Sequence, residues 1–289
     1  NIGDGNDVIT DTSGMDHIEL GNGITVDDVR LLNEPYYGDL YLYIGDEQVR
    51  VSGHFNNTGN EVETILFSDG STLTLTGDLT FKGSSGNDLI RGQSNVTAND
   101  TFIGLEGDDT LYGYDGDDTY YWNLGDGNDV IEDTAGMDLL VLGAGITVDD
   151  LRLENRLGGD LRLHIGSEYI TVRNQFDATG YEVETILFDD DSTFNLTGDL
   201  TFTGSSSNDF VYAQENVTAD DTLIGLEGND YLYGYDGDDT YVWNIGDGND
   251  IIRDDAGTAD QLVLGAGITL NDLRFWNDYG DLQIHIGNE

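Results

Sequence analysis

The sequence predicts an all-β protein in which turn-rich solenoid segments alternate with small antiparallel β modules. Three observations lead to this prediction. Glycine occurs 40 times and proline once, while 16 tyrosines and 10 phenylalanines supply apolar material for a core. Asn, Asp, Gly, Thr and Tyr dominate the sequence, and none of them is a strong helix former. Long blocks of sequence also recur about every 121 residues, as they do in tandem repeat proteins.

The long repeat is visible in several identical segments. GDGND occurs at 3–7, 125–129 and 246–250, and VETILF occurs at 62–67 and 183–188. The chain therefore holds more than two copies of one unit. Both of its ends fall inside repeated segments, so we expect the sequence to be a window of a longer tandem array.

A shorter repeat of nine residues occurs inside each long unit. GLEGDDTLY (104–112) is followed by GYDGDDTYY (113–121), and GLEGNDYLY (225–233) is followed by GYDGDDTYV (234–242). These segments resemble the G-G-x-G-x-D-x-U-x nonapeptide of the RTX, or hemolysin-type, calcium-binding repeat proteins. Glycine at position four and aspartate at position six are retained. The second glycine of the pattern is replaced by Leu105, Tyr114, Leu226 and Tyr235.

The nonapeptide spacing has a physical reason. Glycine permits the positive φ that a tight turn demands, and the three residues 110–112 that follow are enough for a short strand. One apolar residue per nonapeptide is expected to point inward, as at Ile90, Phe102, Leu111 and Leu232. Alternating turns and strands give a solenoid. The family resemblance implies, more specifically, a right-handed parallel β-roll.

Oxygen chemistry points to several calcium ions as cofactors. Calcium takes six to eight oxygen ligands at about 2.3–2.6 Å, which glycine turns supply as carbonyls and the sixth-position aspartates supply as carboxylates. In this register the candidate ligands are Asp7, Asp88, Asp100, Asp109, Asp118, Asp129, Asp209, Asp221, Asp230, Asp239 and Asp250. Asp16, Asp138 and Asp260 hold the same register position in turns with a degraded glycine pattern.

Other turn residues complete the predicted metal sites. They are Gly104, Glu106, Asp108, Gly113, Asp115, Asp117, Gly225, Glu227, Asp236 and Asp238. The aspartates at position five, Asp108, Asp117 and Asp238, are expected to face solvent and to offer their carbonyls.

Charge excludes several classes of partner. The chain has 58 acidic and 10 basic residues, for a formal net charge of −48. Direct binding to nucleic acid is excluded, because phosphate recognition needs basic patches, and no apolar run is long enough for a membrane span. Repulsion among so many carboxylates needs neutralisation, so we expect metal binding and folding to be coupled.

The blocks between the solenoid segments have a different sequence pattern. Leu161, Leu163 and Ile165 alternate with polar residues after a glycine turn at 158–160, which predicts half-buried hairpin strands. These blocks resemble the β-rich module that accompanies hemolysin-type repeats, and each is expected to pack as a small antiparallel sheet on the end of a roll. The predicted segments are the end of a first roll at 1–20, module 1 at 21–80, roll 2 at 81–142, module 2 at 143–201, roll 3 at 202–264 and the start of module 3 at 265–289.

Catalytic motifs are missing from the sequence. It has no HExxH, GxSxG or P-loop pattern and no cysteine, so we expect no enzyme activity in this region. Tyrosines cluster on the rolls, at Tyr112, Tyr114, Tyr120, Tyr121, Tyr231, Tyr233, Tyr235 and Tyr241, with Trp122 and Trp243 behind them. A stacked outer column is the favoured interpretation of the tyrosines, and a sugar-stacking face is the alternative.

The leading functional hypothesis is a structural calcium-binding region of a secreted or cell-surface protein, such as the stalk or fibre of an adhesin, a surface-layer protein or a filament. The family resemblance implies type I secretion, with folding after export into calcium. Copies of the chain are possible partners, by end-to-end or lateral assembly. The alternatives are the C-terminal calcium-binding and secretion region of a secreted enzyme, and a filament subunit with a carbohydrate-binding face.

Overall fold

The computed structural model describes residues 1–34, 38–56, 61–94, 96–156, 158–176, 182–215 and 217–287. Within these ranges the regular structure is β-strand apart from three short 3-10 helices. The chain forms two compact units, residues 1–151 with 165–196 and residues 152–164 with 197–289. The all-β prediction is confirmed.

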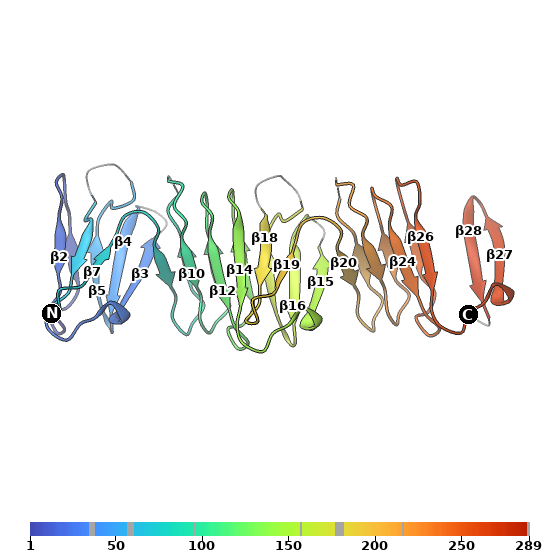
Figure 1. Cartoon of the computed structure of the whole chain (residues 1–289), viewed down its shortest axis with the longest axis horizontal. Coiled ribbons are helices and arrows are strands. Elements are labelled where there is room, and N and C mark those ends of the chain that lie inside the picture. Colours follow the sequence, from blue (N-terminus) through green and yellow to red (C-terminus); the bar gives the residue numbers. More distant parts are fainter. Residues whose placement is uncertain are drawn as a thin grey trace. The chain divides into compact units, whose positions relative to one another are not determined.

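Short parallel strands build the roll of the first unit (Figure 1). One sheet contains β8 (Thr80–Lys82), β10 (Thr101–Ile103), β12 (Thr119–Trp122) and β14 (Asp138–Leu142). The other contains β9 (Leu89–Arg91), β11 (Thr110–Tyr112) and β13 (Asp129–Glu132). The chain therefore alternates between two sheets, with a glycine turn at each change, and the predicted parallel β-roll is confirmed.

The second unit repeats this arrangement. Its first sheet contains β20 (Thr201–Thr203), β22 (Thr222–Ile224), β24 (Thr240–Trp243) and β26 (Gln261–Leu264). Its second sheet contains β21 (Phe210–Tyr212), β23 (Tyr231–Tyr233) and β25 (Ile251–Arg253). All of these neighbours pair in parallel.

The antiparallel modules continue the sheets of the rolls. In the first unit β3 (Val29–Glu34), β4 (Asp39–Ile44) and β5 (Glu47–Val51) pair antiparallel. However, β5 also pairs in parallel with β1 (Asp7–Ile9), and β3 meets β8 in parallel. The sequence predicted a small sheet packed on the end of each roll. Instead, the outer strands of the module pair with strands at the edges of the roll sheets.

The remaining strands lie before, between and after these elements. They are β2 (His17–Glu19), β6 (Thr64–Leu66), β7 (Thr72–Thr74), β15 (Leu151–Asn155), β16 (Leu161–Ile165), β17 (Glu168–Val172), β18 (Val183–Leu187), β19 (Thr193–Asn195), β27 (Leu273–Asp278) and β28 (Asp281–Ile286). The 3-10 helices are η1 (Val26–Asp28), η2 (Val148–Asp150) and η3 (Leu270–Asp272). Each helix follows a threonine that donates its N–H and O–H to the helix's last aspartate, as Thr25 does to Asp28 at 2.8 Å.

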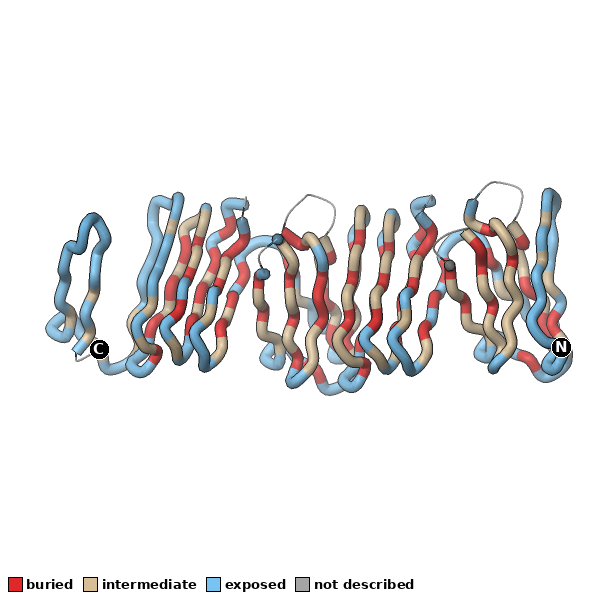
Figure 2. The backbone as a smooth tube through the Cα atoms, turned by 180° about the vertical axis from the view of Figure 1, so that it is seen from behind, coloured by how far each residue is buried: buried red, intermediate tan, exposed pale blue. Residues whose placement is uncertain are grey.

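A stack of inward side chains forms the core of each roll. In the first unit Phe81, Phe102 and Tyr120 lie in register on neighbouring strands, with ring centroids 5.9 and 5.1 Å apart. Ile90 and Leu111 are equally buried in the facing sheet. Figure 2 shows buried residues alternating with more exposed ones along these strands. The inward positions predicted from the nonapeptide are confirmed.

Tyrosines occupy two different environments. Tyr112 and Tyr114 stack on each other outside the first roll, and in the second unit the Tyr212 and Tyr233 rings stack at 5.1 Å. Because stacked rings cover one another's faces, this geometry favours the outer-column interpretation over a sugar platform. The prediction of an outer position is wrong for Tyr120 and for its counterpart Tyr241 in the second unit, which lie in the core.

The replaced second glycine keeps its backbone conformation. Leu105, Tyr114, Leu226 and Tyr235 all have positive φ, between 64° and 74°. Non-glycine residues are uncommon in this left-handed region. The nonapeptide turn therefore imposes the conformation whatever the residue, which explains why the repeat pattern has glycine there.

Candidate metal centres

The sixth-position aspartates stack along two edges of each roll, at the points where turns lead into strands. In the first unit we call Asp88, Asp109 and Asp129 the first edge, and Asp100, Asp118 and Asp138 the second edge. Counterparts in the second unit are Asp209, Asp230 and Asp250 on the first edge, and Asp221, Asp239 and Asp260 on the second. The parallel strands bring together aspartates that are 18 to 21 residues apart in the chain.

One oxygen of each stacked carboxylate is tied to the backbone of the preceding turn. The N–H of Asp88 donates to Oδ1 of Asp109 at 2.7 Å, and the N–H of Asp109 donates to Oδ1 of Asp129 at 2.9 Å. The second edge repeats the pattern, with the N–H of Asp100 donating to Oδ1 of Asp118 at 2.6 Å. These bonds fix each side chain, so that its Oδ2 has a defined direction.

Five Oδ2 atoms on these edges are buried and have no hydrogen-bond partner. They belong to Asp109, Asp118, Asp138, Asp230 and Asp239. The sequence placed all five at the ligand position of the nonapeptide, with Asp138 in a turn that has a degraded glycine pattern. An ionised oxygen without a partner is costly in a protein interior. A hard cation bound by oxygen ligands would remove that cost, so the donor set fits calcium.

First-position glycines leave room beside these oxygens. A Cβ on Gly104 would overlap Oδ2 of Asp109, and a Cβ on Gly225 would overlap Oδ2 of Asp230. A Cβ on Gly92 would come within 2.8 Å of the Gly113 carbonyl oxygen, beside Oδ2 of Asp100. Glycine at position one thus keeps a small space open between carboxylate and carbonyl oxygens.

The first turn of each roll satisfies its carboxylates with protein donors. Oδ2 of Asp88 accepts hydrogen bonds from the N–H and hydroxyl of Ser84 at 2.5 and 2.8 Å. Asp100 accepts from the N–H of Leu79 and from both the N–H and the side-chain amide of Gln93. Counterparts in the second unit are Asp209 with Ser205, and Asp221 with Leu200 and Gln214. Because protein donors already satisfy these four predicted ligands, they need a cation less than the aspartates of the later turns do.

The other predicted ligands lie outside the buried stacks or at their margins. Asp129 is buried, Asp250 is half-buried, and Asp7 is exposed at the start of β1. Exposed side chains are those of Glu106, Asp108, Asp115, Asp117, Glu227 and Asp236, while Asp238 is half-buried. Position-five carboxylates accept backbone N–H groups of the next turn, as Asp108 does from Asn128 at 2.9 Å. Their predicted outward direction is therefore confirmed at Asp108 and Asp117.

Sequence reasoning missed two further buried carboxylates in the first unit. Asp133 is fully buried beside the second edge, and Asp126 is buried beside the first edge, where it accepts hydrogen bonds from the backbone and side chain of Asn123. Asp254 and Asp247 are their counterparts in the second unit. For Asp133 the available signal was an aspartate at position one, where the better nonapeptides have glycine.

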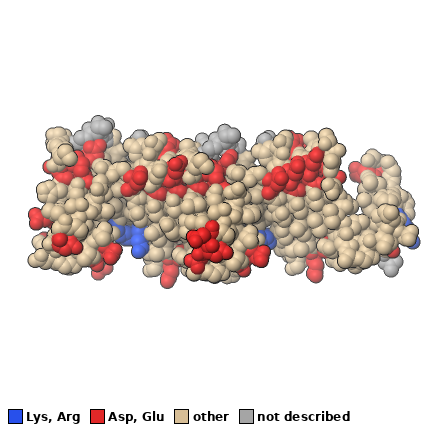
Figure 3. Space-filling model, in the orientation of Figure 1, with Lys and Arg blue, Asp and Glu red and all other residues tan. Residues whose placement is uncertain are grey.

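Burial dominates the electrostatics of the edges. It raises the pKa of Asp109 to about 6, of Asp118 and Asp129 to about 7, and of Asp138 to about 8. Neighbouring carboxylates raise these pKa values further. Figure 3 shows Asp and Glu side chains gathered in several patches on one face, with Lys and Arg at few points. Without a cation, the edges therefore resist full ionisation at neutral pH.

Comparison with known proteins agrees with these turns. The RTX calcium-binding nonapeptide repeat matches residues 80–95, 96–126, 123–146 and 217–242. The Haemolysin-type calcium binding protein related domain matches residues 39–76. The chain thus carries hemolysin-type calcium-binding repeats together with the related β-rich module, and the resemblance inferred from the sequence is confirmed.

Whole-chain comparisons add less. No curated protein matches the chain. Among solved structures, the extracellular lipase LipA from Serratia marcescens matches 74% of this chain at 20% identity, with a TM-score of 0.26. The chain spans 37% of the length of that lipase. A search of the described residues for membrane-spanning helices finds none that is long and apolar enough.

Proposed function

We propose that this chain is a calcium-dependent, extracellular structural repeat region that folds and becomes rigid when its turns bind Ca²⁺. One observation carries the proposal. Buried Oδ2 atoms of Asp109 and Asp118 in the first unit, and of Asp230 and Asp239 in the second, lack any protein donor. These stacked carboxylates are buried and need a cation as their partner. Folding therefore depends on that cation.

Each part of the turn has a role in holding the ion. Oδ1 of Asp118 is fixed by a backbone N–H, which directs Oδ2 toward the space beside Gly113. Gly113 has no Cβ to fill that space. Bound calcium supplies positive charge and accepts several oxygen ligands at once. The same residues leave the neighbouring carboxylates too close to ionise together when no cation is present.

Repetition of the site favours a structural role over catalysis. Both units carry unpaired oxygens at equivalent turn positions, and stacked side chains fill the space between the sheets. A structural repeat array needs the same site many times, whereas one active site per protein suffices for an enzyme. The stalk or fibre of a secreted adhesin, a surface-layer protein or a filament would use such an array, with copies of the chain as possible partners.

Calcium supply supports an extracellular location. Millimolar calcium outside cells saturates even weak oxygen sites, whereas cytosolic calcium is far too low for them. A chain of this kind would stay unfolded until it is exported, as type I secretion requires, and would then fold on contact with calcium. The high negative charge would keep it soluble in both states.

Thermal unfolding of the whole chain tests the proposal. The chain is stripped of metal and measured by circular dichroism and calorimetry at pH 7.5, in chelator, in calcium and in magnesium at matched ionic strength. We expect one cooperative transition or more in calcium only, because magnesium holds its own water and demands octahedral geometry. An equally cooperative transition in chelator would contradict the proposal, and equal stabilisation by magnesium would indicate charge screening.

A further inference from the structure

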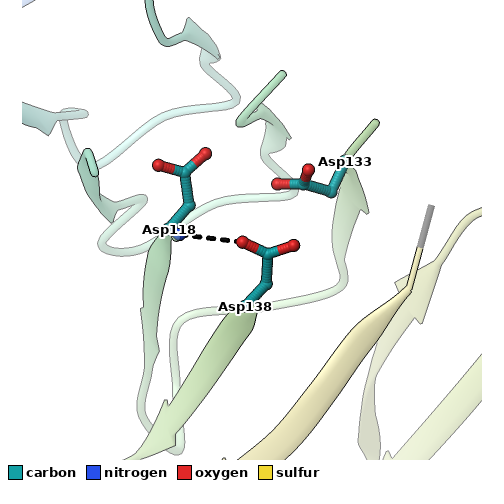
Figure 4. Close-up of side chains that lie close together, drawn as sticks. All are labelled: Asp118, Asp133 and Asp138. Carbon is teal, nitrogen blue, oxygen red and sulfur yellow. Dashed lines mark hydrogen bonds between the residues drawn. The ribbon is translucent and has the colours of Figure 1, made fainter. Parts of the chain in front are cut away.

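A third carboxylate lies beside the second edge of the first unit. Asp133 occupies position one of its nonapeptide, where Gly104 and Gly113 stand in the better copies. One oxygen each of Asp118, Asp133 and Asp138 lies within 4.8 Å of the others, and all three residues are buried. Figure 4 shows the three side chains converging from neighbouring turns. In the described part of the chain this is the only such group of three or more metal-ligating side chains.

Two of these side chains direct an unpaired oxygen into the cluster. Oδ1 of Asp118 and Oδ1 of Asp138 each accept one backbone N–H, from Asp100 and Asp118 respectively. Their Oδ2 atoms accept nothing, although Asp118 is 1% exposed and Asp138 is 2% exposed. Solvent therefore does not compensate these oxygens, and a bound cation is the remaining partner.

Asp133 is held rigidly in position. Its Oδ1 accepts the backbone N–H groups of Thr134 and Ala135 at 2.6 and 3.1 Å, and its Oδ2 accepts the buried hydroxyl of Tyr120. Tyr120 reaches this point because it lies in the core stack and its ring spans the roll toward the turn. The orientation of the third carboxylate is thus set before any ion binds.

A small space in front of these oxygens is kept open by glycine. A Cβ added to Gly113 would overlap the Tyr120 hydroxyl, Oδ2 of Asp133 and Oδ2 of Asp118. Three oxygens, two from the nonapeptide 113–121 and one from Asp133, therefore border the space beside Gly113.

The second unit repeats only part of this arrangement, because none of its described carboxylates form a group of three within 4.8 Å of one another. Tyr241 donates to Oδ2 of Asp254 at 2.7 Å, and a Cβ on Gly234 would overlap the Tyr241 hydroxyl and Oδ2 of Asp239. The N–H of Asp239 donates to Oδ1 of Asp260 at 3.2 Å. This counterpart is more exposed than the first, since Asp254 is half-buried.

We propose that Asp133 converts a two-aspartate turn into a three-carboxylate site, which holds a hard cation more tightly than the other turns and prefers trivalent to divalent ions. The inference rests on the proposed function, because it assumes that the turn aspartates bind cations. Three carboxylates exceed the charge of Ca²⁺ by one and match that of a lanthanide ion. In a site without solvent this charge balance counts more than it does at the surface.

Terbium binding to the whole chain tests the site. Tyr120 borders the site, so its excitation should sensitise luminescence from bound Tb³⁺. The wild-type chain is expected to hold one tight Tb³⁺ there against competing calcium. Asp133→Asn should weaken the binding of this ion at least about tenfold. Asp149→Asn, at an exposed position outside the roll, is the matched control and should leave this binding unchanged.

Stability of the same variants separates a metal site from a structural hydrogen bond. Asn at 133 keeps the shape and the acceptor oxygen but removes one charge. We therefore expect Asp133→Asn to be more stable than the wild type in chelator and less stable in calcium. Destabilisation under both conditions would mean that Asp133 serves only to accept the hydrogen bond of Tyr120, and it would overturn the inference.

Failures of the two proposals have different signatures. A wild-type chain that binds neither Tb³⁺ nor Ca²⁺ refutes the proposed function itself. A chain that binds both, with the number of tight ions unchanged in Asp133→Asn, refutes only the three-carboxylate site. If Asp133→Asn does not fold in calcium, the same measurements on Asp138→Asn decide, because that change also removes one of the three carboxylate charges.

Discussion

The metal-free chain is expected to lose stability as the pH rises from about 4 to about 8. Burial raises the pKa of Asp118 and Asp129 to about 7, from an ordinary value of 3.8. In this window the folded state therefore retains protons that the unfolded state has released. Stability then falls as the pH rises, because the folded state must either keep these protons or bury an unpaired charge.

Asp118 alone gives the scale of this effect. A rise of its pKa from 3.8 to about 7 corresponds to a loss on the order of 4 kcal/mol above pH 7, at about 1.4 kcal/mol per pKa unit. The side chain is 1% exposed, so water screens it little. Small domains are stable by only about 5–15 kcal/mol. One such group therefore removes a large share of the stability, and a stack of them suffices to unfold a metal-free roll.

Urea unfolding of chelator-stripped protein at pH 5, 6, 7 and 8 measures the effect. Without metal, we expect the free energy of unfolding to fall from pH 5 upward until no cooperative transition remains above pH 7. In saturating calcium it should change little, because the cation favours the ionised carboxylates. A metal-free stability that stays constant or rises between pH 5 and pH 8 would refute the reasoning, since it would mean that the stacked carboxylates ionise freely in the folded state.

Other substitutions test the turns one part at a time. Gly116→Ala should cost about 3 kcal/mol or more in calcium, because φ is 143° and the new Cβ would overlap the Ala98 carbonyl; Gly86→Ala, whose Cβ meets nothing nearer than 4.0 Å, should cost under about 1 kcal/mol in the same urea titration. Ser84→Ala should cost about 1 kcal/mol in calcium at pH 7.5 and in chelator at pH 5 alike, and a loss seen only in calcium would contradict the view that the first turn is satisfied by protein donors. Asp109→Asn should reduce the calcium bound per chain, measured by calorimetry, and an unchanged stoichiometry would exclude this side chain as a ligand.

Much of the fold follows from the nonapeptide register. Glycine at position four and aspartate at position six fix where each turn ends, and the next three residues place Leu111 and Ile90 in the core. The all-β class and a solenoid were therefore predictable from the register, and the parallel roll from the family resemblance. The pairing of the module strands was not predictable. The alternation at Leu161 and Leu163 indicates a half-buried strand but does not specify which strands pair with it. Pairing of β5 with β1 depends on edges that become available only in the folded roll.

The metal site was predictable in part. Asp109 and Asp118 follow from the register, and both have the unpaired oxygens expected of ligands. The register could not separate them from Asp88, because the Ser84 donors that satisfy Asp88 come from the turn's own geometry. Asp133 was missed because a position-one aspartate breaks the pattern, and only the folded structure brings the Tyr120 hydroxyl to it.

A crystal structure of the chain grown in calcium, with anomalous data to locate the ions, is the most direct test. Peaks are expected beside Oδ2 of Asp109, Asp118, Asp230 and Asp239, with carbonyl oxygens of the neighbouring turns completing each coordination shell at about 2.3–2.6 Å. Well-ordered turns without such peaks, in which these carboxylates bond to water or to protein donors, would contradict the claim that cations hold the rolls together.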